Sequence, residues 1–288
     1  DPQCVAALSA CTNLVRVELF LVHGRAWLDS LLQLPALKHV TVDCIGDHLA
    51  WPADAAAPPP QLCSWETLTV DELHIFNVPW LVLPGLQQLH LSQLSLEPSC
   101  IIDEQAWESM GARTMVDAAV SALLPLAQQG GLVWTEHGGE AQLDVEGLQR
   151  WAGALAGLAP LAPHLPPVRL RVSEREQQQA TVTGSQLAQL LASLAGLQLS
   201  RLGLLDHGPS QAFFAALRQS PTVVRTVMLR HCREVQEADF ALFLSHCPRP
   251  MHVELHMPSA AAAASVQAVQ QALTQHGLQS SVEVVVIE

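Results

Sequence analysis

Two histidine–cysteine pairs come closest, by residue type and spacing, to a metal site. His231-Cys232 and His246-Cys247 would supply four nitrogen and sulfur ligands of the kind that zinc prefers. Adjacent ligands usually splay to opposite sides of the backbone, so one pair does not easily reach a common ion. We therefore expect Cys232 and Cys247 to be buried as small apolar residues, and we expect no metal site.

Other candidates for chemistry are weaker. Asp206-His207 is an acid–base pair, but its members are adjacent on a polar turn and rarely cooperate in that arrangement. His252 and His256, in HVELH, lack the glutamate of a HExxH motif and would lie ~13 Å apart along a strand, too far for one metal. The sequence contains no GxGxxG, no GxxxxGK[ST] and no GxSxG. We predict that the protein is not an enzyme and holds no cofactor.

The elements that position these residues follow a repeated pattern. The template apolar-x-x-apolar-x-apolar begins at Leu14, Leu37, Val70 and Leu86, and the steps between these starts are 23, 33 and 16 residues. It returns at Leu165, Leu199, Val224 and, in degenerate form, Pro250. A step of 16 residues is too short to include a helix. Either one of the two flanking matches is false, or a tight loop replaces the helix.

The stretch LQQLHLSQLSL at 86–96 shows what the template does. We expect Leu86, Leu89 and Leu91 to point into the core from a short strand and its entry, and Leu94 and Leu96 to point inward after the chain turns off the strand.

Amphipathic segments separate many of the matches. Helices are predicted at 184–197, 208–220, 234–247 and 258–277. In the middle of the chain, 101–129 predicts a long helix, 131–139 a strand and turn, and 141–158 another helix carried by Leu148, Trp151 and Leu155. The Pro/Ala-rich segment 51–61 predicts a loop.

This alternation resembles leucine-rich repeats of the kind in which a helix backs each strand. VRTVMLRHC places Cys232 eight residues after Val224, where the repeat consensus has Asn or Cys, and this is similar to the cysteine-containing repeats of F-box proteins. The resemblance implies an irregular α/β solenoid with a curved parallel β-sheet and a helical insert. Its parts would be N-terminal repeats at 1–98, irregular helical repeats or an insert at 99–160, and C-terminal repeats at 161–288, in one continuous solenoid.

In such a solenoid the third, fifth and seventh template positions form the concave face. In the first half these are Arg16, Glu18, Phe20, His39, Thr41, Asp43, Glu72, His74, Phe76, Gln88, His90 and Ser92. In the second half they are Pro167, Arg169, Arg171, Arg201, Gly203, Leu205, Thr226, Met228, Arg230, His252, Glu254 and His256. The partner-binding residues we expect are the four arginines of the second half with His252 and His256, together with His39, His74 and His90. They would bind an acidic or phosphorylated segment of a protein partner. Alternatively, these positions are polar only because they face solvent, or Glu254 and acidic helices neutralise them.

Composition excludes several classes of function. A net charge of −13 disfavours binding to nucleic acid or to anionic membranes, and no apolar run reaches the ~18 residues that span a bilayer. Seven cysteines, an odd number without a CxxC, predict free thiols in a reducing intracellular compartment, the cytoplasm first and an organelle second. No signal peptide is visible. The chain begins with Asp1, so we expect a processed chain or a piece of a longer protein.

These observations favour a non-catalytic scaffold for protein–protein interaction. Two alternatives stay open: the substrate-recognition subunit of an F-box ubiquitin ligase, and a structural subunit of a large assembly.

Overall fold

The computed structural model is an α/β fold with parallel strands. It describes residues 2–22, 25–45, 64–96, 111–135, 137–146, 151, 153–173, 184–194, 196–205, 226–230, 251–256, 267, 270, 271, 273–275 and 282–287. The chain divides into two compact units, of which the first comprises Asp1–Gln142 and Pro163–Pro166 and the second comprises Leu143–Ala162 and Pro167–Glu288.

The bounds of the elements are as follows. The strands are β1 Arg16–Val22, β2 His39–Ile45, β3 Thr67–His74, β4 Gln88–Leu96, β5 Leu132–Trp134, β6 Ala141–Glu146, β7 Val168–Ser173, β8 Leu199–Leu205, β9 Thr226–Arg230, β10 Met251–His256 and β11 Val282–Ile287. The α-helices are α1 Pro2–Ser9, α2 Arg25–Leu32, α3 Val78–Leu81, α5 Ala112–Gln128 and α7 Gly184–Ser193. Short 3-10 helices are η1 Ile75–Asn77, η2 His137–Gly139, η3 Ala154–Leu158 and η4 Ala162–His164.

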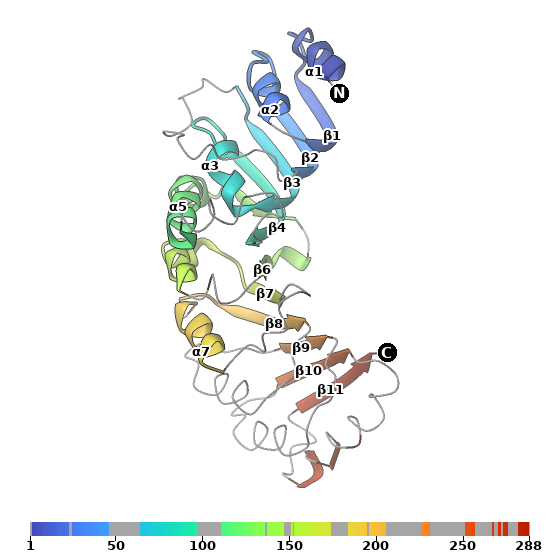
Figure 1. Cartoon of the computed structure of the whole chain (residues 1–288), viewed down its shortest axis with the longest axis vertical. Coiled ribbons are helices and arrows are strands. Elements are labelled where there is room, and N and C mark those ends of the chain that lie inside the picture. Colours follow the sequence, from blue (N-terminus) through green and yellow to red (C-terminus); the bar gives the residue numbers. More distant parts are fainter. Residues whose placement is uncertain are drawn as a thin grey trace. The chain divides into compact units, whose positions relative to one another are not determined.

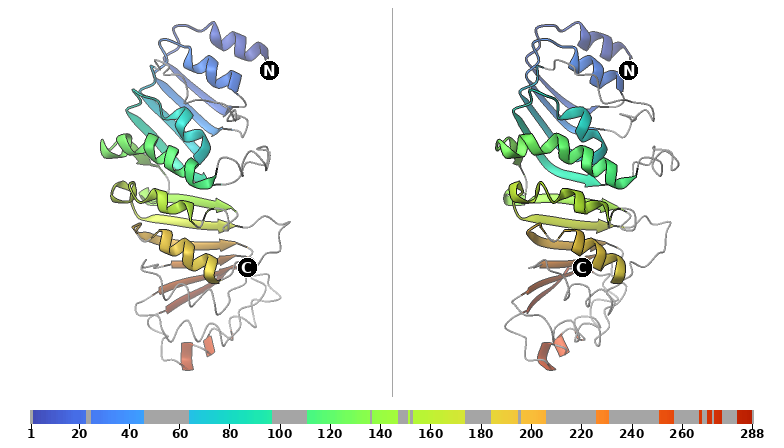
Figure 2. Two further views of the ribbon diagram at one scale, coloured as in Figure 1. Left: turned by 60° about the vertical axis from the view of Figure 1, so that its left-hand side comes forward. Right: turned by 90° about the vertical axis from the view of Figure 1, so that its left-hand side faces the viewer.

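In the first unit, strands β1 to β4 lie side by side in chain order, and β5 pairs with β4 (Figure 1). Each of these pairings is parallel. Helices α2, α3 and α5 lie along one face of the strands (Figure 2). The core forms between them, because Leu68, Val70, Leu89 and Leu91 are fully buried on the strands and Val116 is fully buried on α5.

In the second unit, the strand order runs from β6 to β11, and β7 to β11 pair in parallel. Helix α7 packs near η3, and the buried residues Leu190 and Leu191 of α7 join Leu155 of η3 in the core. Val168, Leu170 and Val172 alternate with exposed or half-buried positions along β7, which is the pattern of a strand with one buried face. Trp151 is also fully buried.

Helix α5 and strand β5 confirm two predictions for the middle of the chain. Val116, Ala119, Val120 and Leu123 form the buried stripe of α5, as their helical spacing predicts. The predicted helix at 141–158 is wrong at its beginning, because residues 141–146 form β6. In AQLDVE, apolar and polar residues alternate with a period of two, which is the spacing of a strand.

The third repeat was predicted in the wrong frame. In β3, Leu68 and Val70 lie in register with Leu89 and Leu91 of β4, so the template begins at Trp65 and not at Val70. Trp65 itself is 2% exposed. The repeat starts 14, 37, 65 and 86 then give steps of 23, 28 and 21 residues, which removes the anomalous step of 16. Between β3 and β4 the chain has room only for η1 and the four-residue helix α3.

The sequence allowed two frames because the third and fourth repeats each satisfy the template twice. Val70, Leu73 and Ile75 fit it as well as Trp65, Leu68 and Val70 do. In β4 the second fit is Leu91, Leu94 and Leu96, and all five leucines of LQQLHLSQLSL are buried as predicted. The chain does not turn off the strand after Leu91, however, because β4 continues to Leu96.

Several predicted segments lie outside the described residues. They are the helices at 208–220 and 234–247, the loop at 51–61, and the part of the long helix at 101–110.

Candidate partner-binding face

The outward-facing positions of the second unit begin on β7. Arg169 is half-buried and Arg171 is exposed, and they alternate with the buried Val168, Leu170 and Val172. This alternation places both guanidinium groups on the face of the strands opposite the core, as the template predicts.

Arg169 and Arg201 are neighbours across the β7–β8 pair. The register runs from Val168 opposite Leu199 to Arg169 opposite Arg201, so β8 contains one extra residue, Ser200. The Ser200 hydroxyl donates to the carbonyl oxygen of Val168 at 3.1 Å, which holds this irregularity in place. Adjacent strands lie about 4.8 Å apart, so two cationic residues occupy neighbouring positions on one face.

Arg171 lies beside an acidic residue and a glycine. Its Nη1 is 3.7 Å from Oδ2 of Asp144 on β6, and the Asp144 side chain is only 8% exposed. On the other side Arg171 lies opposite Gly203 of β8. A Cβ at Gly203 would lie 3.9 Å from Cγ of Arg171, so the missing side chain leaves space beside the arginine.

The same face continues over β9 and β10. Thr226 lies opposite Arg201, and Met228 lies opposite Gly203. On β10, His252 lies opposite Thr226 of β9. The Nε2 atom of His252 is 3.1 Å from Oε1 of Glu254. Arg230 and His256 are paired in register on β9 and β10, while their side chains lie outside the described part of the structure.

In the first unit the register brings outward-facing positions into rows. One row is Arg16, His39, Thr67 and Gln88, and the next is Glu18, Thr41, Thr69 and His90. His39 and His90 therefore lie on the face where they were predicted, in different rows. His90 Nε2 lies 3.3 Å from Oε1 of Gln88 on the same strand.

His74 does not belong to this face. The corrected frame places Thr67, Thr69 and Asp71 outward on β3, and His74 is 8% exposed at the end of the strand. Its ring stacks on Phe76 with centroids 5.2 Å apart, and Phe76 is also buried. The assignment of His74 and Phe76 to an accessible surface was therefore wrong.

Polar side chains link the strands of the first unit. The Ser92 hydroxyl donates to Oδ1 of Asp71 at 3.5 Å and lies 2.9 Å from the Thr135 hydroxyl. Lys38 donates a hydrogen bond from Nζ to Oε1 of Glu66. This bond, with the positive charge of Lys38, lowers the pKa of the Glu66 carboxyl below its ordinary value.

Asp144 is the residue of this face that the sequence analysis missed. Its signal was the alternation in AQLDVE, which places Asp144 between the buried Leu143 and Val145 on a strand. The helix prediction for 141–158 hid that alternation. Asp144 matters because it neutralises part of the charge of Arg171.

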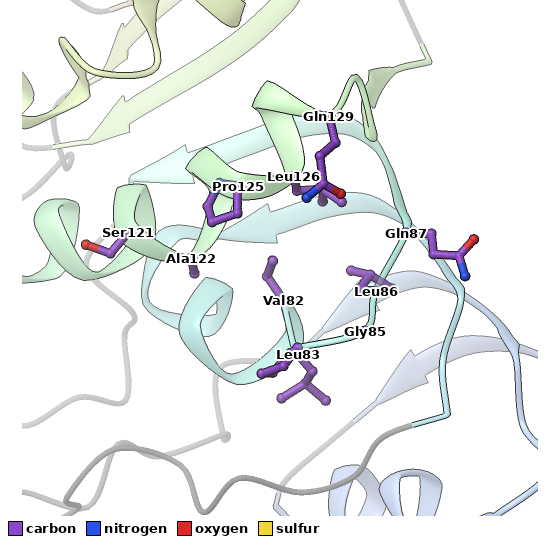
Figure 3. Close-up of a pocket in the computed structure, with 11 residues that line it drawn as sticks. Val82, Leu83, Gly85, Leu86, Gln87, Ser121, Ala122, Pro125, Leu126 and Gln129 are labelled. Carbon is purple, nitrogen blue, oxygen red and sulfur yellow. The ribbon is translucent and has the colours of Figure 1, made fainter.

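A hollow of about 560 Å³ lies on the helical side of the first unit. Its walls are Val82, Leu83 and Leu86 from the loop after α3 and Ala122, Pro125 and Leu126 from α5 (Figure 3). The eleven residues that line it include no acid, base or metal ligand, so it offers no group for acid–base catalysis.

The described residues contain no cluster of three or more His, Cys, Asp or Glu side chains that could hold a metal ion. No helix among them is long and apolar enough to cross a bilayer. The pairs His231-Cys232, His246-Cys247 and Asp206-His207 lie outside that part of the chain.

Compared with models of known protein families and with curated proteins, the chain matches none of them. The leucine-rich-repeat family therefore stays a prediction from the sequence pattern.

Proposed function

We propose that the protein is a leucine-rich-repeat scaffold without catalytic activity. It binds an acidic or phosphorylated segment of a partner protein on the strand face of the second unit. Parallel strands in chain order, with buried aliphatic pairs such as Leu68/Val70 and Leu89/Leu91 in register, support a repeat architecture. Such an architecture presents side chains from successive strands on one surface.

The observation that carries the proposal is Arg169 opposite Arg201. This chain has only 14 Lys and Arg residues and a net charge of −13, and two of its arginines occupy neighbouring positions on one outward face. One anionic group that binds there can contact both guanidinium groups.

The chemistry of the guanidinium group suits this role. Its planar set of N–H donors binds carboxylate or phosphate oxygens in pairs. The space beside Gly203 allows the anion to approach the strands between Arg171 and Arg201, and Thr226 presents a hydroxyl next to Arg201. The pair His252–Glu254 marks where the cationic surface ends.

The test compares partner capture by three forms of the protein. The wild type and the variant Arg169→Gln/Arg171→Gln/Arg201→Gln are used as baits, with and without phosphatase treatment of the extract. Arg113→Gln is the matched control, because Arg113 is an exposed arginine on α5 that pairs with Asp117. The proposal predicts partners that the triple variant loses and the control retains.

The direct measurement follows with a peptide from the captured partner. Its affinity is measured with phosphoserine, glutamate or glutamine at the same position and at two salt concentrations. Affinity for the triple variant should fall for the anionic peptides, and the salt dependence should weaken. Equal affinity of wild type and triple variant for all three peptides would exclude the strand face as the binding surface. Ubiquitin-ligase components among the captured proteins would favour the F-box alternative.

A further inference from the structure

Gly203 occupies a position of β8 at which neither the backbone nor the packing requires glycine. Strand β8 lies between β7 and β9, so Gly203 is in the interior of a sheet. Its φ angle lies outside the left-handed region that favours glycine. A Cβ at Gly203 would lie 3.8 Å from the carbonyl oxygen of Leu170 and 3.9 Å from Cα and Cγ of Arg171, which are ordinary van der Waals distances. Alanine would therefore fit at this position.

Glycine in the interior of a strand has a cost. It offers no side chain for packing and loses more conformational freedom on folding than any other residue, so it weakens the strand. Such a glycine often marks a place where a ligand or another backbone approaches closely. The neighbouring atoms of this fold leave room for a methyl group at Gly203. The close approach must therefore come from a group outside the chain.

Gly203 completes a set of four positions with three arginines. Arg169 lies opposite Arg201, and Arg171 lies opposite Gly203, on the neighbouring strands β7 and β8. The four positions share the outward face and form a quadrilateral, about 4.8 Å across the strands and about 6.6 Å along them. Three corners carry a guanidinium group and the fourth carries no side chain. A small anion above Gly203 is within reach of all three arginines.

The charge around these positions suits phosphate better than carboxylate. The three arginines contribute three positive charges. Asp144 contributes one negative charge, since its Oδ2 lies 3.7 Å from Nη1 of Arg171 and its side chain is 8% exposed. Two positive charges remain in excess. A phosphorylated side chain carries a charge of about −1.5 to −2 at pH 7 and three acceptor oxygens, whereas a carboxylate carries a single negative charge. Guanidinium groups bind phosphate oxygens in pairs.

We propose that the phosphate group of a phosphorylated serine or threonine in the partner segment binds above Gly203, between the three arginines. This inference rests on the proposed function and narrows it from an acidic or phosphorylated segment to a phosphorylated one. Thr226 of β9 lies opposite Arg201 and diagonal to Gly203, so its hydroxyl supplies a further donor. The missing side chain determines specificity, because a side chain at position 203 would occupy the space of the phosphate.

The test measures binding of three blocked pentapeptides with two alanines on each side of a central phosphoserine, glutamate or serine. Amide resonances of Gly203, Arg201 and Thr226 in NMR titrations report binding at this place. We expect the phosphoserine peptide to shift them with a dissociation constant at least about tenfold lower than that of the glutamate peptide. The serine peptide should leave them unchanged.

Two variants, Gly203→Ala and Gly203→Val, fill the fourth corner. Gly203→Ala should unfold at the same urea concentration as the wild type or a higher one, and each variant should weaken binding of the phosphoserine peptide about tenfold or more. The matched control is Gly196→Ala, in the segment between α7 and β8. A Cβ at Gly196 would lie 3.6 Å from Cβ of Ala162, which is again an ordinary contact. This control should bind the phosphoserine peptide like the wild type.

The outcomes separate this inference from the proposed function. Binding of the phosphoserine peptide that the triple arginine variant loses, but both Gly203 variants retain, would overturn the inference and leave the proposed function standing. Equal affinity for the phosphoserine and glutamate peptides would overturn the choice of phosphate. If no peptide shifts the three resonances, the place above Gly203 is not a phosphate site, and partner capture with the triple variant still decides the proposed function.

Discussion

Arg169 and Arg201 lie directly opposite one another on β7 and β8, on the face of the strands that points away from the core. The irregular register at Ser200 produces this juxtaposition, because without the extra residue Arg169 would lie opposite Ser200. The proposed role of this pair is anion binding and not support of the fold. That role makes separate predictions for stability and for binding.

Removing one of the two charges should separate these effects. We expect Arg201→Gln to change the free energy of unfolding by no more than about 0.5 kcal/mol, because relief of repulsion offsets the lost contacts. Binding of an acidic partner should nevertheless weaken. Arg113→Gln, which breaks the pair between Arg113 and Asp117 on α5, should cost about 0.3–0.5 kcal/mol and leave binding unchanged. Urea unfolding and titration with the partner peptide measure the two quantities. A large loss of stability in Arg201→Gln would show that the arginine supports the fold.

The ion pair between Lys38 and Glu66 predicts a pH dependence with a definite sign. The hydrogen bond from Lys38, with the charges of Lys38 and His39, lowers the pKa of Glu66 from its ordinary value of 4.5. A depressed pKa in the folded state stabilises the protein above the unfolded pKa, and this contribution is lost as the pH falls through the folded value. We expect Lys38→Met to raise the pKa of Glu66 and to remove this contribution, while Lys38→Arg retains both. Titration of the Glu66 carboxyl by NMR measures the pKa directly. An unchanged titration in Lys38→Met would show that the pair is not formed in solution.

The sequence predicted the class of fold because short apolar pairs recur at strand spacing. Core pairs such as Val40/Val42 and Leu89/Leu91 appear at intervals, and their burial against helices follows from elementary packing. The frame of β3 was not predictable from the template alone. Trp65 occupies a position where the other first-unit repeats have Leu, and Val70, Leu73 and Ile75 satisfy the same spacing five residues later. The registers of β3 with β2 and with β4 distinguish the two frames.

The corrected frame of β3 distinguishes two phenylalanines, Phe20 and Phe76, that the sequence pattern placed at the same template position. Phe76 is 4% exposed and stacks on His74, whereas Phe20 is 79% exposed on β1. We expect Phe76→Ala to lower the free energy of unfolding by about 3–5 kcal/mol. Phe20→Ala should change it by less than about 0.5 kcal/mol, because the Phe20 side chain lies mostly in solvent. Chemical unfolding of both variants measures the difference. Similar values for the two would contradict the assigned frame.

The alternation of core and outward positions along a strand predicted part of the candidate site. Arg169 and Arg171 lie on the outward face because each stands between two core residues of β7, and Arg201 directly precedes the buried Leu202. Asp144 was not found because a helix was predicted across β6, and its pairing with Arg171 joins residues on two different strands. Long-range pairings of this kind depend on register, which local spacing does not specify.

Two adjacent glycines, Gly130 and Gly131, follow α5. From the sequence they indicate only a turn, but in the structure the backbone of Gly131 lies close to that of Gln87. Gly130 has φ of 73° and open space around it, so Gly130→Ala should cost about 1–2 kcal/mol from backbone strain alone. Gly131 is different, because a Cβ there would lie 2.2 Å from the carbonyl oxygen of Gln87 and 2.7 Å from Cδ1 of Leu126. Its N–H donates to the Leu126 oxygen at 2.9 Å, and its own oxygen accepts from the N–H of Leu89 at 2.8 Å. Gly131→Ala must therefore displace backbone that anchors β5 beside β4.

We expect Gly131→Ala to destabilise the protein more than Gly130→Ala, since overpacking against a backbone atom adds to the loss of these hydrogen bonds. Urea unfolding gives the two free energies. Amide exchange at Leu89 locates the effect, because its N–H should lose protection in Gly131→Ala and keep it in Gly130→Ala. Equal protection of Leu89 in the two variants would show that the end of α5 moves without disturbing the β4–β5 pair.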